Sequence, residues 1–296
     1  MSSHETSKGP PDASAGLFFR LWQRFIAPPA EVMVKRYRIR PKGWPTPLRI
    51  AMVSDLHMGD PYMPLSRLDA IVEQTRALKP DLVLLPGDLV PGPSMVRTRE
   101  PPLAEIAARL ARLKAPLGTY AVLGNHDWWS DTAAQARKTG PVAAGQALQA
   151  AGIPVLSNRA LGLKNGVWLA GLESQEALRG KGKWDITGLD DLTATLARVP
   201  PGAPTLLLAH EPYIFADLPD NVAVTLSGHT HGGQIRIRGW APIVPRTINR
   251  KYLYGHITEG DRHLVVSAGL GYSKLPLRIG TPPEITLVDL AADTAT

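Results

Sequence analysis

The sequence predicts an α/β fold built on parallel strands, and three observations support this prediction. Three apolar runs, LRIAMVSD, DLVLLPGD and TYAVLGNHD, show no polar alternation and are therefore typical of buried strands. Amphipathic segments at about 66–79 and 103–114 separate these runs and predict helices, the first with Ser66 as its N-cap. Strand and helix thus alternate from residue 48 to 127, and such β-α-β units form parallel sheets with right-handed crossovers.

The second half of the chain predicts further strands with shorter connections. These strands are GVWLAGLE, TLLLAHEP, VAVTLSGH, HLVVSAGL and EITLVDL, and a helix is expected at 188–198. Short links do not leave room for a helical crossover at every step, so these strands are expected to form a second, more mixed or antiparallel sheet. The patterns at 128–150, 174–187 and 232–256 indicate no definite element.

The N-terminal part has a different character from the rest of the chain. Residues 1–15 are rich in Ser, Gly and Pro, which is typical of a disordered tail. Residues 16–27 predict an amphipathic helix whose aromatic face and arginine-bearing face fit a membrane interface or, alternatively, docking on the protein's own core. We therefore divide the chain into a tail, helix and lead-in at 1–47 and one domain at 48–296.

The composition limits the possible functions. The chain has 296 residues and no cysteine, which excludes disulfides and thiolate metal ligands. A formal charge of +7 suits an anionic partner, although solubility alone is an alternative explanation. No stretch reaches the roughly 20 apolar residues of a membrane span, and no secretory signal is evident. These features predict a cytoplasmic protein that contacts the inner membrane peripherally if the 16–27 helix binds lipid. No protein partner is predicted.

Five strand ends carry residue types that bind metals. A turn or helix-cap role could explain any one of them, but the five together predict one site beyond the carboxyl ends of the strands. In SGHTHGGQ, alternation in an extended segment would point His229 and His231 the same way. The five segments are Asp55-Leu56-His57, Gly87-Asp88, Gly124-Asn125-His126-Asp127, His210-Glu211 and Gly228-His229-Thr230-His231.

This ordered set of motifs resembles the calcineurin-like metallophosphoesterase superfamily. The tail GLGYSKLPLRIGTPPEITLVDL is similar to a bacterial branch that is often membrane-associated, so the resemblance covers about 48–290. It implies a four-layer α-β-β-α sandwich with two packed mixed sheets and a site for two metal ions. By position, it implies Asp55, His57 and His231 as ligands of the first ion, Asn125, His210 and His229 as ligands of the second, and Asp88 as the bridge.

The chemistry of such a site is that of phosphate ester hydrolysis. Two cations about 3.5–4 Å apart can clamp a phosphate and acidify a bridging water, and the resulting hydroxide attacks phosphorus. His126, which the resemblance places facing the substrate, would protonate the leaving oxygen, and Asp127 would orient its ring. Histidine and carboxylate ligands together fit Mn, Fe or Zn better than Mg or Ca.

The substrate is less determined than the reaction. Arginines and lysines interleave with aromatic residues in 179–184 and 236–254, which suits a phosphate-bearing substrate with a base or acyl group, or else forms a solvated basic surface. We weigh a phosphodiesterase or pyrophosphatase for a lipid-linked or nucleotide-sugar substrate such as UDP-2,3-diacylglucosamine. The alternatives are a soluble enzyme for nucleotides, nucleic acid or phosphoproteins, and a non-catalytic binding module.

Overall fold

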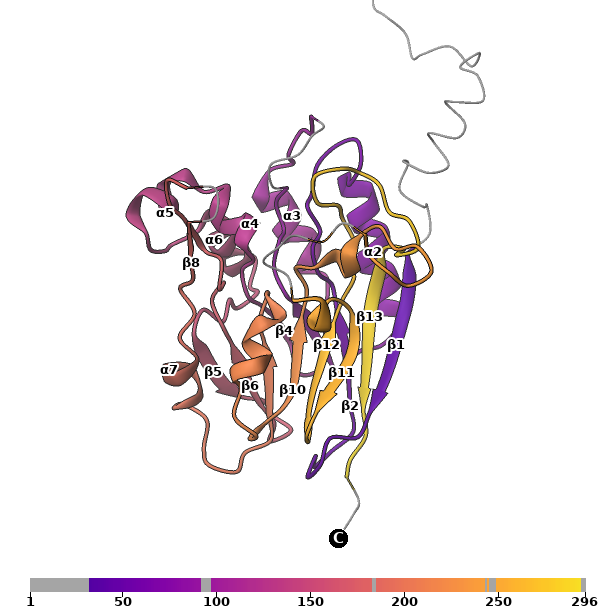
Figure 1. The fold of residues 1–296 in the computed structure, drawn as a ribbon, viewed down its shortest axis with the longest axis vertical. Coiled ribbons are helices and arrows are strands. Elements are labelled where there is room, and N and C mark those ends of the chain that lie inside the picture. The colour runs from indigo at the N-terminus through magenta and orange to yellow at the C-terminus, as the bar shows by residue number, and fades with distance from the viewer. Residues whose placement is uncertain (1–31, 92–96, 183–184, 243, 245–248, 294–296) are drawn as a thin grey trace, which may run out of the picture.

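Two large β-sheets pack face to face, and helices cover their outer faces (Figure 1). The computed structural model describes residues 32–91, 97–182, 185–242, 244 and 249–293. One apolar cluster lies between the sheets, and it includes Ile50 and Met52 from one sheet and Leu206 and Leu226 from the other. A cluster on each outer face joins a sheet to its helices. The predicted α-β-β-α sandwich is therefore confirmed.

The first sheet has the strand order β1-β13-β2-β3-β4. Strands β2, β3 and β4 are mutually parallel, as the β-α-β pattern predicted. The expectation that EITLVDL belongs with the later strands was wrong, because β13 pairs parallel to β1 and antiparallel to β2. Strand β1 lies in the lead-in and was not predicted. The strands are β1 (Met33–Ile39), β2 (Leu48–Met52), β3 (Leu82–Leu85), β4 (Thr119–Ala121) and β13 (Glu284–Leu290).

The second sheet has the order β11-β12-β10-β9-β6-β5 and is mixed, as predicted. Its four central strands run parallel, and only the edge pairs β5–β6 and β11–β12 are antiparallel. A short hairpin, β7 (Leu178–Arg179) with β8 (Ile186–Thr187), stands apart from both sheets. The strands are β5 (Arg159–Gly162), β6 (Trp168–Gly171), β9 (Thr205–Leu208), β10 (Val222–Ser227), β11 (Gly255–Glu259) and β12 (Arg262–Val266).

The helices lie where they were predicted wherever the apolar residues of the sequence recur with a helical period. Helix α2 (Leu65–Ala77), α3 (Leu103–Leu110) and α7 (Leu192–Leu196) lie at the predicted places. Ser66 is not the N-cap of α2, because Pro64 occupies that position and Ser66 lies inside the first turn. Three short helices were not predicted: α4 (Asn125–Trp129), α5 (Thr132–Arg137) and α6 (Ala143–Ala150). The described part of the chain also contains the 3₁₀ turns Pro212–Asp217, His231–Gly233 and Arg250–Tyr252.

The predicted tail at 1–15 and amphipathic helix at 16–27 lie outside the described residues. Among the residues that are described, no helix combines the length and apolar character needed to cross a bilayer. The division of the chain at residue 47 stays a prediction.

Candidate metal centre

The candidate ligands follow five strands whose carboxyl ends meet at one end of the molecule. Strands β2, β3 and β4 bring them from the first sheet, and β9 and β10 bring them from the second. Ligand atoms within 4.8 Å of one another form three overlapping groups of metal-ligand type. The structure therefore brings all seven predicted ligands together in one buried cluster. They are Asp55, His57, Asp88, Asn125, His210, His229 and His231.

The backbone turns sharply where these residues leave their strands. Asp55, His57, Asp88, His229 and His231 all have φ between 44° and 71°, a region that residues other than glycine rarely adopt. Such left-handed residues concentrate at functional sites, where the surrounding structure holds them in place. The alternation proposed for His229 and His231 was therefore wrong: β10 ends at Ser227, and left-handed turns aim the two rings.

Two glycines leave room for the cluster. A Cβ atom on Gly124 would lie 2.7 Å from the backbone nitrogen of Asp88 and 2.7 Å from His210 Cε1. A Cβ atom on Gly228 would meet the side chains of Ser54 and Asp55 well inside normal contact. The glycines of G-N-H-D and G-H-T-H are thus required by close approach, since neither has a positive φ.

The first half of the cluster joins Asp55, His57 and His231. The two ring nitrogens His57 Nε2 and His231 Nε2 lie 3.0 Å apart. Asp55 Oδ1 lies 3.9 Å from His231 Nε2 and accepts a hydrogen bond from the backbone N–H of His229 at 2.8 Å. Its other oxygen accepts a hydrogen bond from the Ser54 hydroxyl. This carboxylate is held by the G-H-T-H turn itself.

The second half joins Asn125, His210 and His229. The carbonyl oxygen Oδ1 of Asn125 lies 3.1 Å from His210 Nε2 and 3.0 Å from His229 Nδ1. The two rings meet edge to face, with centroids 5.1 Å apart. These three side chains come from α4, the end of β9 and the turn after β10, so three separate segments define this half.

Asp88 lies between the two halves. The backbone N–H of His126 donates to Asp88 Oδ1 at 2.9 Å and fixes the carboxylate. The other oxygen, Oδ2, then faces both halves, 3.5 Å from His57 Nε2 and 3.2 Å from His210 Nε2. Burial opposes charge on Asp88, but His210 and His126 outweigh it and hold the pKa of this carboxyl well below its ordinary value.

The donor atoms are arranged as metal ligands require. Ring nitrogen Nδ1 of His57 donates to the carbonyl of Val90 at 3.0 Å, and Nδ1 of His210 donates to that of Pro86 at 2.9 Å. Because a carbonyl only accepts, each ring carries a proton on Nδ1, which leaves Nε2 as the nitrogen that would bind a metal ion. Nitrogen and carboxylate donors in this number fit divalent transition metals.

His126 lies beside the cluster but is not part of it. Its ring meets that of His57 edge to face at 4.9 Å and rests against Trp129 at 5.2 Å. Its Nδ1 is buried without a hydrogen-bond partner in the described residues. Burial, reinforced by His57 and His210 against the opposing charge of Asp88, lowers the pKa of His126 to about 3. The ring is therefore a neutral group with an unused nitrogen.

The prediction that Asp127 orients the ring of His126 was wrong. Its carboxylate accepts hydrogen bonds from the backbone N–H groups of Asp88 and Gly124, both at 2.9 Å, and of Leu89, also at 2.9 Å. The side chain of the third residue in a helix faces back toward the first turn, which explains these partners. Asp127 thus ties the G-D turn after β3 to the start of α4.

Further residues around the cluster were missed in the sequence. Arg278 is buried, lies 3.1 Å from His231 Nδ1 through Nη2, and donates to the carbonyls of Ala268 and Gly271. Glu176 lies 3.9 Å from His229 Nε2, and burial followed by the charge of Glu211 raises its pKa to about 7. Neither residue stands in a strand-end motif, so only the folded chain reveals them.

One of the two basic and aromatic segments, 179–184, reaches the edge of the cluster. Arg179 stacks on Trp129 with 4.0 Å between the guanidinium carbon and the ring centre, and Trp129 in turn contacts His126. This arrangement brings one cation of the 179–184 segment to the edge of the cluster. Lys183, Trp184 and Arg246 lie outside the described residues.

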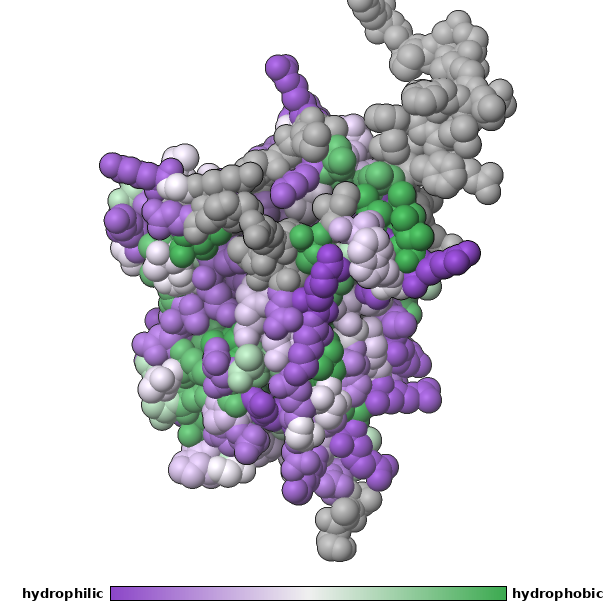
Figure 2. Space-filling model, viewed as in Figure 1, coloured by the Kyte–Doolittle hydropathy of each residue, from purple (hydrophilic) through white to green (hydrophobic). Residues whose placement is uncertain are grey.

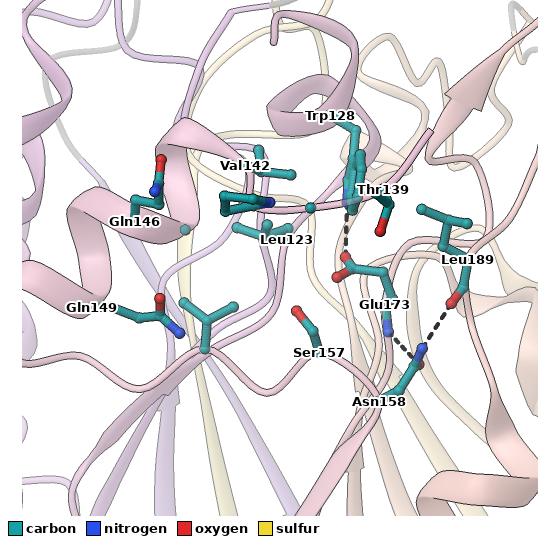
Figure 3. A pocket seen from close by; sticks show the side chains of 14 residues that line it. Leu123, Trp128, Thr139, Val142, Gln146, Gln149, Ser157, Asn158, Glu173 and Leu189 are labelled. Carbon is teal, nitrogen blue, oxygen red and sulfur yellow. Dashed lines mark hydrogen bonds between the residues drawn. The ribbon is translucent and has the colours of Figure 1, made fainter. Parts of the chain in front are cut away.

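A separate cavity of about 390 Å³ lies beside α4, which contributes Trp128 to its lining (Figure 3). Trp128 and Glu173 line it, and the indole Nε1 of Trp128 donates to Glu173 Oε1 at 2.8 Å. The amide of Asn158 donates to the carbonyl of Leu189 at 2.7 Å and closes one side. None of the seven candidate ligands lines this cavity, so it is not part of the metal centre.

Comparisons with known proteins agree with this geometry. Residues 48–233 match the model of the calcineurin-like phosphoesterase family. The chain is 31% identical to the uncharacterized metallophosphoesterase YkuE of Bacillus subtilis, over 82% of this chain and 78% of that one. It is 30% identical to the phosphodiesterase YaeI of Escherichia coli, with 82% of each covered. A bovine transmembrane protein with a metallophosphoesterase domain is 30% identical, over 83% of this chain and 53% of that one.

The chain belongs to the calcineurin-like phosphoesterase family. The enzyme class that the sequence predicted is thereby confirmed: the protein is a phosphoric ester hydrolase of the metallophosphoesterase type. A catalytic role is favoured over a binding module, because every candidate ligand is present and faces the cluster.

Proposed function

We propose that this protein is a phosphodiesterase that uses two divalent transition metal ions. Asp55, His57 and His231 would hold the first ion, and Asn125, His210 and His229 the second. The observation that carries the proposal is the position of Asp88, whose Oδ2 faces a histidine of each half while Oδ1 is fixed by a backbone amide. When bound, such ions neutralise phosphate charge and supply a nucleophile from water.

The chain's own residues supply the remaining functions. His126 faces the cluster from α4, and a neutral ring with an unpartnered nitrogen can form a hydrogen bond to a substrate oxygen. The anionic charge of a bound phosphate would favour protonation of this ring and oppose the effect of burial. Proton donation to the leaving oxygen then falls to His126, with Trp129 against one side of the ring.

For the substrate, we favour a phosphodiester or pyrophosphate that carries a lipid or a nucleotide-sugar, such as UDP-2,3-diacylglucosamine. Cationic and aromatic side chains beside the cluster support this choice, with Arg179 stacked on Trp129 as the nearest pair. We further propose that residues 16–27 bind anionic lipid peripherally and keep the enzyme at the inner membrane. A soluble nucleotide, nucleic acid or phosphoprotein substrate is the alternative, and a panel of such substrates separates them.

The test of the metal assignment is Asp88→Ala. This change removes the carboxylate whose Oδ2 lies within 3.5 Å of a histidine of each half, so we expect loss of most bound metal and of phosphodiesterase activity. Metal per chain is measured by elemental analysis of protein purified without chelator, and activity with bis(p-nitrophenyl) phosphate. Asp131→Ala is the control, because Asp131 caps α5 away from the cluster. Full activity with normal metal content in the Asp88 variant would overturn the proposal.

A further inference from the structure

Two loops beside the metal centre expose large apolar side chains. Of the five large apolar residues that are well exposed in the described part of the chain, four lie here. Ile237 and Trp240 follow the G-H-T-H turn and are 58% and 61% exposed, while Leu275 and Ile279 lead into β13 and are 38% and 39% exposed. We call these four residues the loop patch. Their concentration in one place distinguishes them from isolated surface apolar residues.

The two loops are joined into one surface. The backbone N–H of Arg236 donates to the carbonyl of Ile279 at 2.7 Å, and that of Ile279 donates to the carbonyl of Gln234 at 3.0 Å. The amide of Gln234 also donates to the carbonyls of Ser273 and Leu275, at 3.1 and 3.0 Å. Because the residues around the patch are fixed by these bonds, its exposure is a property of the folded domain.

The charge of these loops is entirely positive. The segments 234–258 and 268–283 contain seven arginines and lysines and no aspartate or glutamate. Arg238 is exposed between Ile237 and Trp240 in the sequence, and Arg236 donates to the carbonyl of Gly239. Within the described residues, neither arginine forms an ion pair with a carboxylate. Lys251 pairs with Glu259, whereas the positive charge of Arg236 and Arg238 beside the patch has no carboxylate partner among the described residues.

The first strand of the domain, β1, begins at the same place. The backbone N–H of Met33, the first residue of β1, donates to the carbonyl of Pro283 at 2.9 Å. Strand β1 therefore begins beside the end of the loop that carries Leu275 and Ile279. Figure 2 shows apolar side chains at the upper right of the visible face, over the loop that leads into β13, with hydrophilic side chains beside them.

We propose that the loop patch is a second lipid-contact surface, which docks on an anionic bilayer and brings the metal centre to its surface. Apolar side chains among unpaired arginines match the acyl and headgroup layers of such a membrane. A symmetric second copy would set arginine against arginine. Residues 16–27 carry only Arg20 and Arg24 as charges and offer no anionic partner either. The charge thus favours lipid over both alternative occupants.

This proposal is independent of the metal chemistry and is tested on the full chain. Wild-type protein is mixed with vesicles of phosphatidylcholine alone or of equal parts phosphatidylcholine and phosphatidylglycerol, and sedimentation is measured at low and high salt. Ile237→Ser with Trp240→Ser removes apolar contact, and we expect about a tenfold weaker partition into anionic vesicles. Arg238→Glu reverses one charge, and we again expect a loss of about tenfold or more.

Lys164→Glu is the matched control. Lys164 is exposed in the turn between β5 and β6, at the opposite end of the strands, so its reversal should leave sedimentation unchanged. Metal content per chain, measured by elemental analysis, should be unchanged in all three variants, which separates this proposal from the proposed function. Three results would overturn the proposal: wild-type protein that does not bind anionic vesicles; patch variants that bind like wild type; or patch variants that become monomeric or melt at lower temperature with unaltered vesicle binding. The last result would show that a second copy or the chain's own segment covers the patch.

Discussion

Gly124→Ala places one methyl group where the structure has no room for it. The new Cβ would lie 2.7 Å from His210 Cε1, and the ring would have to retreat to 3.4 Å or more to restore normal contact. The backbone nitrogen of Asp88, also at 2.7 Å, cannot retreat freely, because its N–H donates to Asp127. The nearest atom of all would be the carboxylate oxygen Oδ1 of Asp88, so the strain falls on this carboxylate, on His210 and on the turn that carries Asp88.

The expected size of the effect follows from this overlap. Overpacking a closely packed interior costs about 1–3 kcal/mol, which for a domain of this size corresponds to a melting temperature lower by about 3–10 °C. Misplacement of residues that orient or form the ligand shell lowers metal affinity by about 10–100-fold. Thermal melting with and without Mn²⁺, together with metal titration, measures both effects.

Gly162→Ala is the matched control for this variant. Gly162 also lacks a positive φ, and its Cβ would meet the Trp168 ring at 3.5–3.7 Å, an ordinary contact distance. We expect that variant to melt and bind metal like wild type. If Gly124→Ala behaved in the same way, the close approach of Gly124 would not be what shapes the cluster, and the reasoning would fail.

Two further predictions concern the chemistry and the N-terminal segment. His126→Ala should keep its metal but lose roughly 10²–10⁴-fold in turnover of a diester with a poor leaving group, and much less with nitrophenolate, because nitrophenolate leaves without protonation. Equal losses for both substrates, measured by steady-state kinetics, would instead assign the ring to phosphate positioning. Deletion of residues 1–30 should weaken sedimentation with anionic vesicles and leave hydrolysis of a soluble diester largely unchanged, because no proposed ligand precedes Asp55. Joint loss of melting temperature and soluble activity would show that the segment packs on its own domain.

The parts of the fold that could be predicted from the sequence are those in which apolar residues form a pattern within a few residues. Buried strands β2, β3 and β4 and helices α2 and α3 each carry an apolar pattern that shows its structure over a few residues. Strand β13 carries an equally clear pattern, but its place between β1 and β2 depends on pairing across more than 200 residues, which no local pattern encodes. The short helices α4 to α6 were missed because five to eight residues hardly define a helical period.

In the candidate metal centre, the residue types could likewise be predicted from local sequence, whereas their geometry could not. The ligand types were evident at the strand ends, but the left-handed φ of His229 and His231 replaced the alternation we had assumed. The role of Asp127 also changed, because hydrogen bonds to amides of the G-D turn depend on contact between two loops. Arg278 could not be predicted, since it reaches His231 from a loop 47 residues later.

The position of β13 has a consequence for biosynthesis. A nascent chain that ends before Glu284 contains every proposed ligand, yet its strands β1 and β2 lack the neighbour that separates and pairs with them. Synthesis must therefore continue past Leu290 before the first sheet can close. During that interval the apolar strands remain open to chaperones or to other nascent chains. We therefore expect the cluster to acquire its metal after β13 has been synthesised, and chains truncated before Glu284 to aggregate instead of forming a partly active enzyme.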